Sequence, residues 1–290
     1  MFSSDAPAKP LSERVPPHVF FVVSAIFHYL GPSFAVLLFA LVESLGVAWL
    51  RIATAALIFA VCRRPWRILR DADRRTLMLI GGLGLALAAM NASFYLAIDR
   101  LPLATVAAIE FVATIAVVLA GVRNLRNLAA LLVTLAGVYA LIGLAGSGDR
   151  LGLLFALINA ALFALYIELG HAISRSGGAS GIDRLGAAML LALIFAAPIG
   201  FSEATAAFLS PTLLLAAIGV GISSSVVPYV CDQLAMARLP RATFALMLAL
   251  LPATAAIVGA IVLRQIPTPV EIFGIALVAL GIAIHRPAPD

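Results

Sequence analysis

The chain alternates between long apolar segments and short polar connections. Each apolar segment has close to the roughly 20 residues that a helix needs to cross a membrane. We expect transmembrane helices at 18–40, 44–62, 76–98, 103–120, 127–144, 151–174, 182–202, 212–236, 241–263 and 269–285. The connections are short and contain Gly, Pro or Ser, which end helices. The pattern predicts an all-α integral membrane protein with ten transmembrane helices, with cytoplasmic tails at 1–17 and 286–290.

One ten-residue sequence occurs twice. Leu96–Thr105 reads LAIDRLPLAT and Leu234–Thr243 reads LAMARLPRAT, with seven identical positions and an offset of 138 residues. Five predicted helices separate the copies, and because five is odd, equivalent helices would cross the membrane in opposite directions. The pattern therefore predicts two inverted five-helix repeats, 18–144 and 151–285, a device of secondary transporters. Duplication for stability alone is the alternative.

Composition agrees with a membrane protein and argues against nucleic acid as a partner. The chain is 63% hydrophobic and 11% charged, with a mean hydropathy of +1.11, whereas a soluble domain carries about 25% charged residues. Most of the 19 Lys and Arg lie in connections on one predicted side, including a run of arginines between Arg63 and Arg75. The positive-inside rule then places both termini in the cytoplasm. The first helix is too long for a cleaved signal peptide.

The sequence lacks the usual marks of metal, ATP or hydrolase chemistry. Its two cysteines, Cys62 and Cys231, lie in apolar context, and there is no CxxC or Cys/His cluster. There is also no GxxxxGK[ST] motif and no HExxH motif. We therefore expect no metal and no cofactor, and a protein that is not an enzyme. An intramembrane enzyme that uses His28 with Glu110 or Asp232, or a non-transporting scaffold, stays as a remote alternative.

Ionisable side chains within the apolar segments cost about 3 kcal/mol each, so each needs a reason. The chain has few of them: His28, Arg51, Glu110, Glu168 and Asp232. Glu110 lies roughly 10 Å deep at about 1.5 Å per residue, with no basic residue in helical reach. It can hold a proton or an ammonium group, and exchange between the two would couple transport to protons. The alternative is a structural ion pair with Arg51.

Three residues are expected to form structural ion pairs. Arg51 should pair with a carboxylate from another helix, although it could also be the counter-charge for a substrate carboxylate. Glu168 and His171 are three residues apart on one predicted helix and can pair with each other. Glu168 lies about 200° around that helix from Tyr166, which indicates a structural or gating role.

Other polar side chains mark the expected wall of a substrate pocket. Asn91 and Tyr95 share one helix face, and Tyr229 shares another with Asp232. Pro228 frees a backbone carbonyl, which is tolerable only against protein or a wet cavity. The remaining candidates are His28 and Tyr166, which are equivalent under the 138-residue offset. The alternative for all of them is hydrogen bonding between helices.

Longer stretches resemble the EamA-type transporters of the drug/metabolite transporter superfamily, and within it the threonine/homoserine exporter branch. The stretches are MNASFYLAIDRLPLATVAAIEF (90–111), VPYVCDQLAMARLPRATFALMLALLPATAAIVGAIVL (227–263), WLRIATAALI (49–58), RRPWR (63–67) and LFALYI (162–167). The resemblance implies ten helices in two inverted repeats around a central cavity. The positions that match polar or aromatic family positions are Arg51, Asn91, Tyr95, Glu110, Tyr166, Tyr229 and Asp232.

The sequence departs from that branch at Leu251, Arg264-Gln265, Ala113-Thr114 and Phe163, where the branch has Glu, Gly-Glu, Gly-Pro and Trp. The pocket is thus expected to be less acidic. We expect a secondary exporter of small metabolites such as threonine or homoserine, in the bacterial inner membrane, working by alternating access with proton antiport. A drug, nucleoside-like or vitamin cargo is the alternative. Small residues in 127–144 and 269–285 would permit a homodimer.

Overall fold

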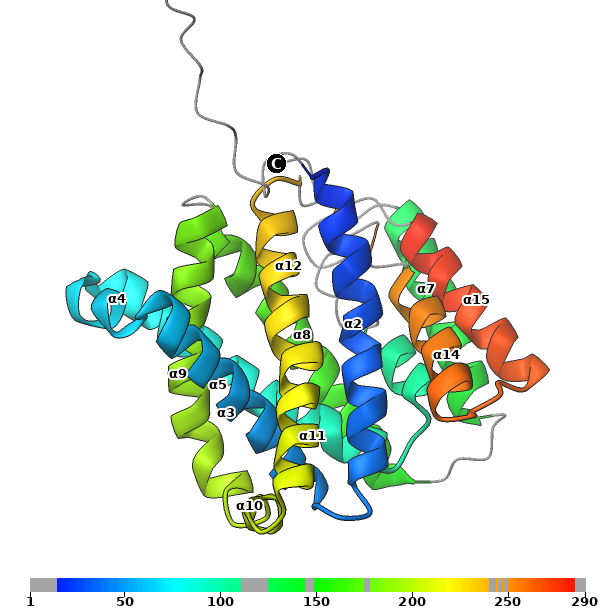
Figure 1. Ribbon diagram of the computed structural model, residues 1–290. Coiled ribbons are helices and arrows are strands. Elements are labelled where there is room, and N and C mark those ends of the chain that lie inside the picture. Colours follow the sequence, from blue (N-terminus) through cyan, green and yellow to red (C-terminus); the bar gives the residue numbers. More distant parts are fainter. Residues whose placement is uncertain are drawn as a thin grey trace, which may run out of the picture.

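The structure is a computed structural model that describes residues 15–110, 125–143, 149–174, 178–239 and 250–284, with Phe244 and Met247. Every regular element in these residues is a helix (Figure 1). The helices are α2 (Pro17–Leu38), α3 (Ser44–Arg63), α4 (Trp66–Asp71), α5 (Arg74–Ile98), a helical stretch at 103–110, α7 (Leu125–Gly143), α8 (Arg150–Ser174), α9 (Gly178–Gly200), α10 (Thr205–Phe208), α11 (Pro211–Gly221), η1 (Ile222–Val226), α12 (Val227–Met236), α14 (Leu250–Val262) and α15 (Pro269–Ile284).

Among the described residues, six helices are long and apolar enough to cross a membrane, and three further apolar helices are shorter. Most agree with the predicted segments to within a few residues, and α11, η1 and α12 together make up the predicted helix 212–236. Parts of the predicted helices 103–120 and 241–263 lie outside the described residues, so the count of ten stays a prediction. The short helix α4, on the arginine-rich connection, was not expected.

The outer surface of the bundle is apolar, as a lipid-facing surface must be. Large aliphatic side chains point outward, among them Val61 at 80% and Ile261 at 74% exposed. Because hydrocarbon offers no hydrogen-bond partners, the backbone must satisfy its own polar groups, and helices do so within each segment. The polar side chains that remain are therefore directed toward the centre.

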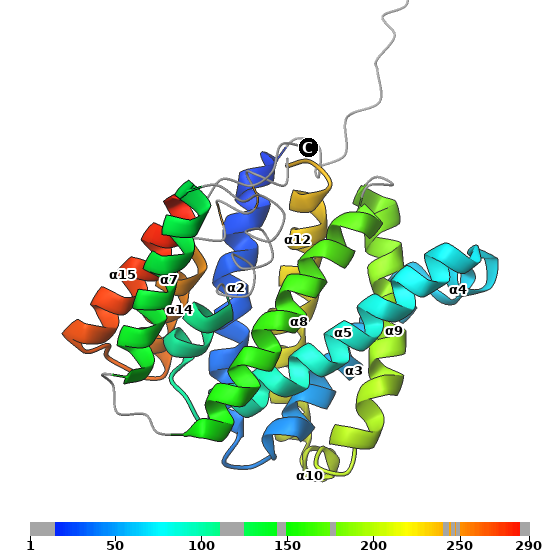
Figure 2. The ribbon, with the colours of Figure 1, turned by 180° about the vertical axis from the view of Figure 1, so that it is seen from behind.

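Helices that are equivalent under the 138-residue offset run in opposite directions. In Figures 1 and 2, α2 descends from the upper face of the molecule and α8 rises from the lower face. The pairs α3·α9 and α7·α15 pack directly against each other. In α7·α15, Arg126 near the start of α7 donates to the carbonyl of Ile284 at the end of α15 (2.6 Å), as antiparallel packing requires. Helices that are equivalent under the offset thus lie antiparallel among the described residues, while the two five-helix repeats stay a prediction.

In each copy of the repeated sequence, an arginine binds the residue just before another helix. The two contacts lie at opposite faces of the molecule. At the lower face, Arg100 Nη1 lies 3.6 Å from Asp149 Oδ2, just before α8. A hydrogen bond from the Gly152 amide lowers the pKa of Asp149, which keeps this carboxylate ionised beside Arg100. At the upper face, Arg238 donates to the carbonyl of Val15, just before α2 (2.8 Å). Each arginine therefore joins the connection after the third helix of one repeat to the start of the first helix of the other.

Gly281 tests the close packing of α7 against α15. A Cβ at this position would lie 2.8 Å from the Ala130 carbonyl oxygen and would also clash with Thr134 Oγ1. We expect Gly281→Ala to lower the stability of the purified protein by about 1–3 kcal/mol, the usual cost of overpacking, seen as a lower midpoint of thermal unfolding in detergent.

The matched control is Gly81→Ala in α5, where an added Cβ would meet nothing within 4 Å. Ala is favoured over Gly in a helix by about 1 kcal/mol, so this variant should be as stable as the parent or more so. Equal midpoints for both variants would contradict the packing described here.

Candidate functional site

The centre of the bundle is lined by tyrosines rather than by aliphatic side chains alone. Tyr29, Tyr95, Tyr166 and Tyr229 are each at most 1% exposed, whereas Tyr139, on α7, is 72% exposed. The rings of Tyr166 and Tyr229 lie 5.5 Å apart. A buried tyrosine usually needs a partner for its hydroxyl group, so this core carries a set of hydrogen bonds.

One buried carboxylate, Glu110, joins three helices. It is 2% exposed and ends the described helical stretch 103–110. Its Oε2 accepts a hydrogen bond from the Tyr29 hydroxyl of α2 (3.2 Å), and its Oε1 accepts one from Asn159 Nδ2 of α8 (2.7 Å). Charge-assisted hydrogen bonds of this kind are stronger than neutral ones. Glu110 is thus held between the two repeats.

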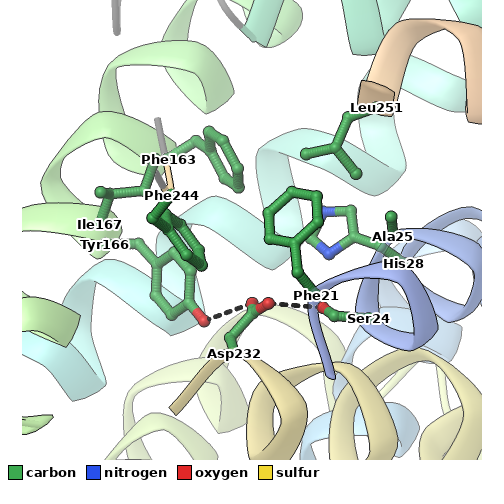
Figure 3. A pocket seen from close by; sticks show the side chains of 10 residues that line it. All are labelled: Phe21, Ser24, Ala25, His28, Phe163, Tyr166, Ile167, Asp232, Phe244 and Leu251. Carbon is green, nitrogen blue, oxygen red and sulfur yellow. Dashed lines mark hydrogen bonds between the residues drawn. The ribbon is translucent and has the colours of Figure 1, made fainter. Parts of the chain in front are cut away.

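The second buried carboxylate, Asp232 on α12, has a similar environment. Its oxygens accept hydrogen bonds from the hydroxyl groups of Tyr166 on α8 (2.9 Å) and Ser24 on α2 (Figure 3). Ser24 also lies 3.2 Å from the Pro228 carbonyl. Within the described residues, no basic side chain forms an ion pair with Asp232. Neutral donors from the same two helices, α2 and α8, therefore surround both carboxylates.

His28 lies between two small cavities and lines both of them. One cavity holds Asp232, Ser24 and Tyr166, and the other holds Glu110. The His28 ring packs edge-on against the rings of Tyr29 (5.2 Å) and Phe163 (5.9 Å). The imidazole thus separates the two acidic groups.

Asn91 and Tyr229 meet at the centre, where the two repeats face each other. Asn91 Nδ2 donates to the Tyr229 hydroxyl (3.4 Å) and to the Leu87 carbonyl (2.7 Å). The two residues are 138 positions apart, the offset between the repeated sequences. Residues equivalent under a two-fold relation can touch only near its axis, so this contact locates the axis within the polar core.

Arg51 is bound to a break in helix geometry rather than to a carboxylate. The segment before Pro228 forms the π-helical turn η1, and proline has no N–H to donate to the carbonyl four residues earlier. That carbonyl belongs to Ser224, and it accepts a hydrogen bond from Arg51 Nη2. Arg51 Nε donates to Ser225 Oγ (2.9 Å), and the guanidinium carbon lies 5.1 Å from the centre of the Tyr95 ring.

The expected ion pair of Arg51 is absent from the described residues, where no carboxylate oxygen lies within 4.0 Å of the guanidinium. The carbonyl freed by Pro228 takes its place as the hydrogen-bond acceptor, since a guanidinium N–H can donate to a carbonyl or to a carboxylate. The pairing of Glu168 with His171 stays a prediction. Glu168 is exposed, and His171 is buried with Nδ1 3.0 Å from the Ile167 carbonyl.

The structure brings the sequence-predicted candidates together and adds three residues. His28, Asn91, Glu110 and Tyr229 line one cavity, and Tyr166 and Asp232 line the adjacent one, while Tyr95 lies beneath Arg51. The added residues are Ser24, Tyr29 and Asn159. A helical-face comparison could have found two of them, since Ser24 is one turn from His28 and Asn159 is two turns from Tyr166. In the described part of the chain, no group of His, Cys, Asp and Glu could hold a metal ion.

Comparison with known proteins places this arrangement in a class. The profile of the EamA-like transporter family matches residues 150–285. The threonine/homoserine exporter RhtA of Escherichia coli (strain K12) is 31% identical over 257 residues, which cover 88% of this chain and 84% of the relative. RhtA of Salmonella typhimurium (strain SL1344) is 32% identical over 251 residues, which cover 86% and 83%.

A solved crystal structure has the same fold. It superimposes with a TM-score of 0.58 at 16% identity and covers 92% of this chain and 96% of its own. Fold, helix count and relatives together define a multi-pass membrane protein of a transporter class. The chain belongs to the EamA-like transporter family of the drug/metabolite transporter superfamily.

Tyr166 tests the importance of the donors around Asp232. Tyr166→Phe removes one hydroxyl donor and leaves the ring in place. A buried carboxylate that loses a hydrogen bond is destabilised by about 1–3 kcal/mol, so the thermal midpoint of the purified protein should fall. The control is Tyr139→Phe, which removes a hydroxyl that is exposed and should leave the midpoint unchanged. A Tyr166→Phe protein as stable as the control would contradict the hydrogen bond.

Proposed function

We propose that this protein is a secondary active exporter of small metabolites, with amino acids such as threonine and homoserine as substrates. The observation that carries the proposal is the buried polar core: two carboxylates, a guanidinium and two asparagines in the middle of an apolar bundle. Such groups are costly inside a membrane protein and mark substrate or ion pathways. The RhtA relatives are threonine/homoserine exporters by name, which supports this cargo.

Transport by alternating access follows from the antiparallel repeats. An inverted repeat can adopt two nearly equivalent shapes, each open to one side of the membrane. The contacts Arg100–Asp149 and Arg238–Val15 lie at opposite faces and at equivalent places in the two repeats. We expect one of them to break in each open state.

Glu110 is the residue proposed to couple transport to protons. It is buried, lines the central cavity and is held by Tyr29 and Asn159. A carboxylate in this environment can exchange a proton for the ammonium group of a substrate. Proton binding to Glu110 would then release the substrate. Antiport requires that the proton and the substrate occupy the site in turn.

The proposed setting is the bacterial inner membrane, with both termini in the cytoplasm. At the upper face, Arg63 pairs with Asp183, Arg126 binds the end of α15, and Arg238 binds the start of α2. This concentration of arginines at one face is what the positive-inside rule expects of the cytoplasmic side. A homodimer through α7 and α15 is also proposed, since small residues in these helices permit helix–helix contacts.

A second cargo class is favoured by one observation. The cavity around Asp232 is lined mainly by apolar and aromatic side chains, including Phe21, Phe163, Phe244 and Leu251 (Figure 3). Leu251 stands where the resembling branch has a glutamate. An aromatic or lipophilic cargo, such as a drug or a nucleoside-like metabolite, would fit such a lining better than a hydroxyl-bearing amino acid.

Glu110→Gln separates coupling from substrate movement. The full-length protein is reconstituted in liposomes, and threonine flux is measured both as counterflow and under an imposed pH gradient. We expect the parent to accumulate threonine with the gradient, and Glu110→Gln to lose that response because glutamine cannot carry a proton. Glu43→Gln, in the exposed connection before α3, is the control and should respond like the parent.

Two results would overturn parts of this proposal. An unchanged response to the pH gradient in Glu110→Gln would remove Glu110 from coupling. An absence of flux for every amino acid in a broad panel would reject amino acids as the cargo, and flux of aromatic compounds in the same panel would support the second class.

A further inference from the structure

Arg51 places a positive charge in the centre of the bundle without an ion pair to any described carboxylate. Its side chain is 4% exposed, and it contacts a serine hydroxyl, a backbone carbonyl and an aromatic ring. A buried charge that forms no ion pair costs several kcal/mol. Such a cost persists in a folded protein when the charge serves a purpose other than stability. We propose that Arg51 binds the carboxylate of the substrate, so that the central cavity recognises both charged ends of an α-amino acid.

The guanidinium lines the cavity and retains a donor nitrogen that no described residue uses. Arginine carries five N–H groups in a planar fork, and the two hydrogen bonds to η1 use Nε and Nη2. Nη1 makes no hydrogen bond to the described residues, and Arg51 lines the cavity that also holds Glu110. The bonds to Ser224 and Ser225, with the Tyr95 ring beneath, fix the plane of the fork. A carboxylate bound edge-on to this fork would make the paired hydrogen bonds that arginine is suited to form.

The same cavity also presents a buried acceptor without a hydrogen-bond partner among the described residues. Asn159 is fully buried, and its Nδ2 donates to Glu110 Oε1 (2.7 Å). Its Oδ1 is buried and has no hydrogen-bond partner among the described residues. An orphan buried acceptor costs about 1–3 kcal/mol. An ammonium group brings three N–H donors, which could serve Asn159 Oδ1 and the Glu110 carboxylate together.

The two charges share one cavity but stay more than an ion-pair distance apart. Arg51 and Glu110 both line it, and no carboxylate lies within 4.0 Å of Arg51 in the described part of the chain. The interior volume is about 10 Å³, which holds one water at most. Substrate entry must therefore move the helices apart. Asn91 and Tyr229, which also line this cavity, are joined by a long hydrogen bond of 3.4 Å.

An α-amino acid supplies what both ends lack. Its carboxylate would give the guanidinium an ion-pair partner, and its ammonium group would donate to Asn159 Oδ1 beside Glu110. A substrate without a carboxylate would leave Arg51 without an ion-pair partner and would therefore bind more weakly. Sites built around a charged hydrogen-bonding group reject analogues that lack it strongly, by factors of about 10² or more. This inference rests on the proposed amino-acid transport and adds the residue that selects for it.

The test compares threonine with threoninamide, which keeps the ammonium and hydroxyl groups but has no carboxylate. The full-length protein is reconstituted in liposomes that are loaded with unlabelled threonine. Uptake of labelled threonine by counterflow is then measured while each compound is titrated outside as a competitor. We expect the parent to prefer threonine by at least about 100-fold. Arg51→Gln should reduce that preference to a few-fold, and Arg51→Lys, which keeps the charge without the fork, should give an intermediate value. Arg70→Gln, at an exposed position on α4, is the matched control and should keep the full preference.

The ratio of the two compounds separates a binding role from a structural one. If Arg51 were purely structural, replacing it would lower the amount of folded protein without changing the preference for threonine over threoninamide. Equal competition by threoninamide in the parent, or an unchanged ratio in Arg51→Gln, would overturn the inference while leaving amino-acid transport intact. If Arg51→Gln does not fold, an unchanged ratio in Arg51→Lys would overturn it equally. A parent protein that carries no amino acid would reject the proposed function itself.

Discussion

A missing hydrogen bond at Pro228 is the constraint on which the centre of this molecule depends. Proline has no N–H, so the Ser224 carbonyl would stand unpaired in a setting where water cannot compensate it. The chain accommodates this with the π-helical turn η1 and with a hydrogen bond from Arg51. Because the guanidinium must be buried to make that bond, the same constraint brings a positive charge into the bundle. The tyrosines, serines and amides around it form the polar surroundings that such a charge requires.

The duplicated frame does not carry duplicated chemistry. Under the offset of 138 residues, Arg51 corresponds to Met189 and Asp232 corresponds to Phe94. The helices are thus arranged with approximate two-fold symmetry, and Asn91 and Tyr229 touch near the axis. The charged residues do not follow this symmetry. A transporter needs two equivalent shapes and one binding site. Symmetric packing of the helices allows the two equivalent shapes, and the asymmetric placement of the charges allows a single binding site.

Part of the site could be predicted from the sequence because buried ionisable residues are conspicuous in apolar segments. Glu110, Asp232 and His28 stand out for this reason, and the structure places all three on adjacent cavities. Their partners were harder to find. Tyr29 and Asn159 bind Glu110 across sequence separations of 81 and 49 residues. No local pattern indicates which face of one helix will meet which face of another.

The sequence by itself determined the class and the approximate helix bounds, and it predicts the relation between the halves. These follow from hydrophobic length and from a repeated motif, which are properties of consecutive residues. Only the tertiary structure decided the partner of Arg51. A guanidinium N–H can donate to a carboxylate or to an orphan carbonyl, and the choice depends on which group the packing of α3 against η1 brings within reach. The same packing places Arg51 in the lining of the central cavity, where we propose that it binds a substrate carboxylate.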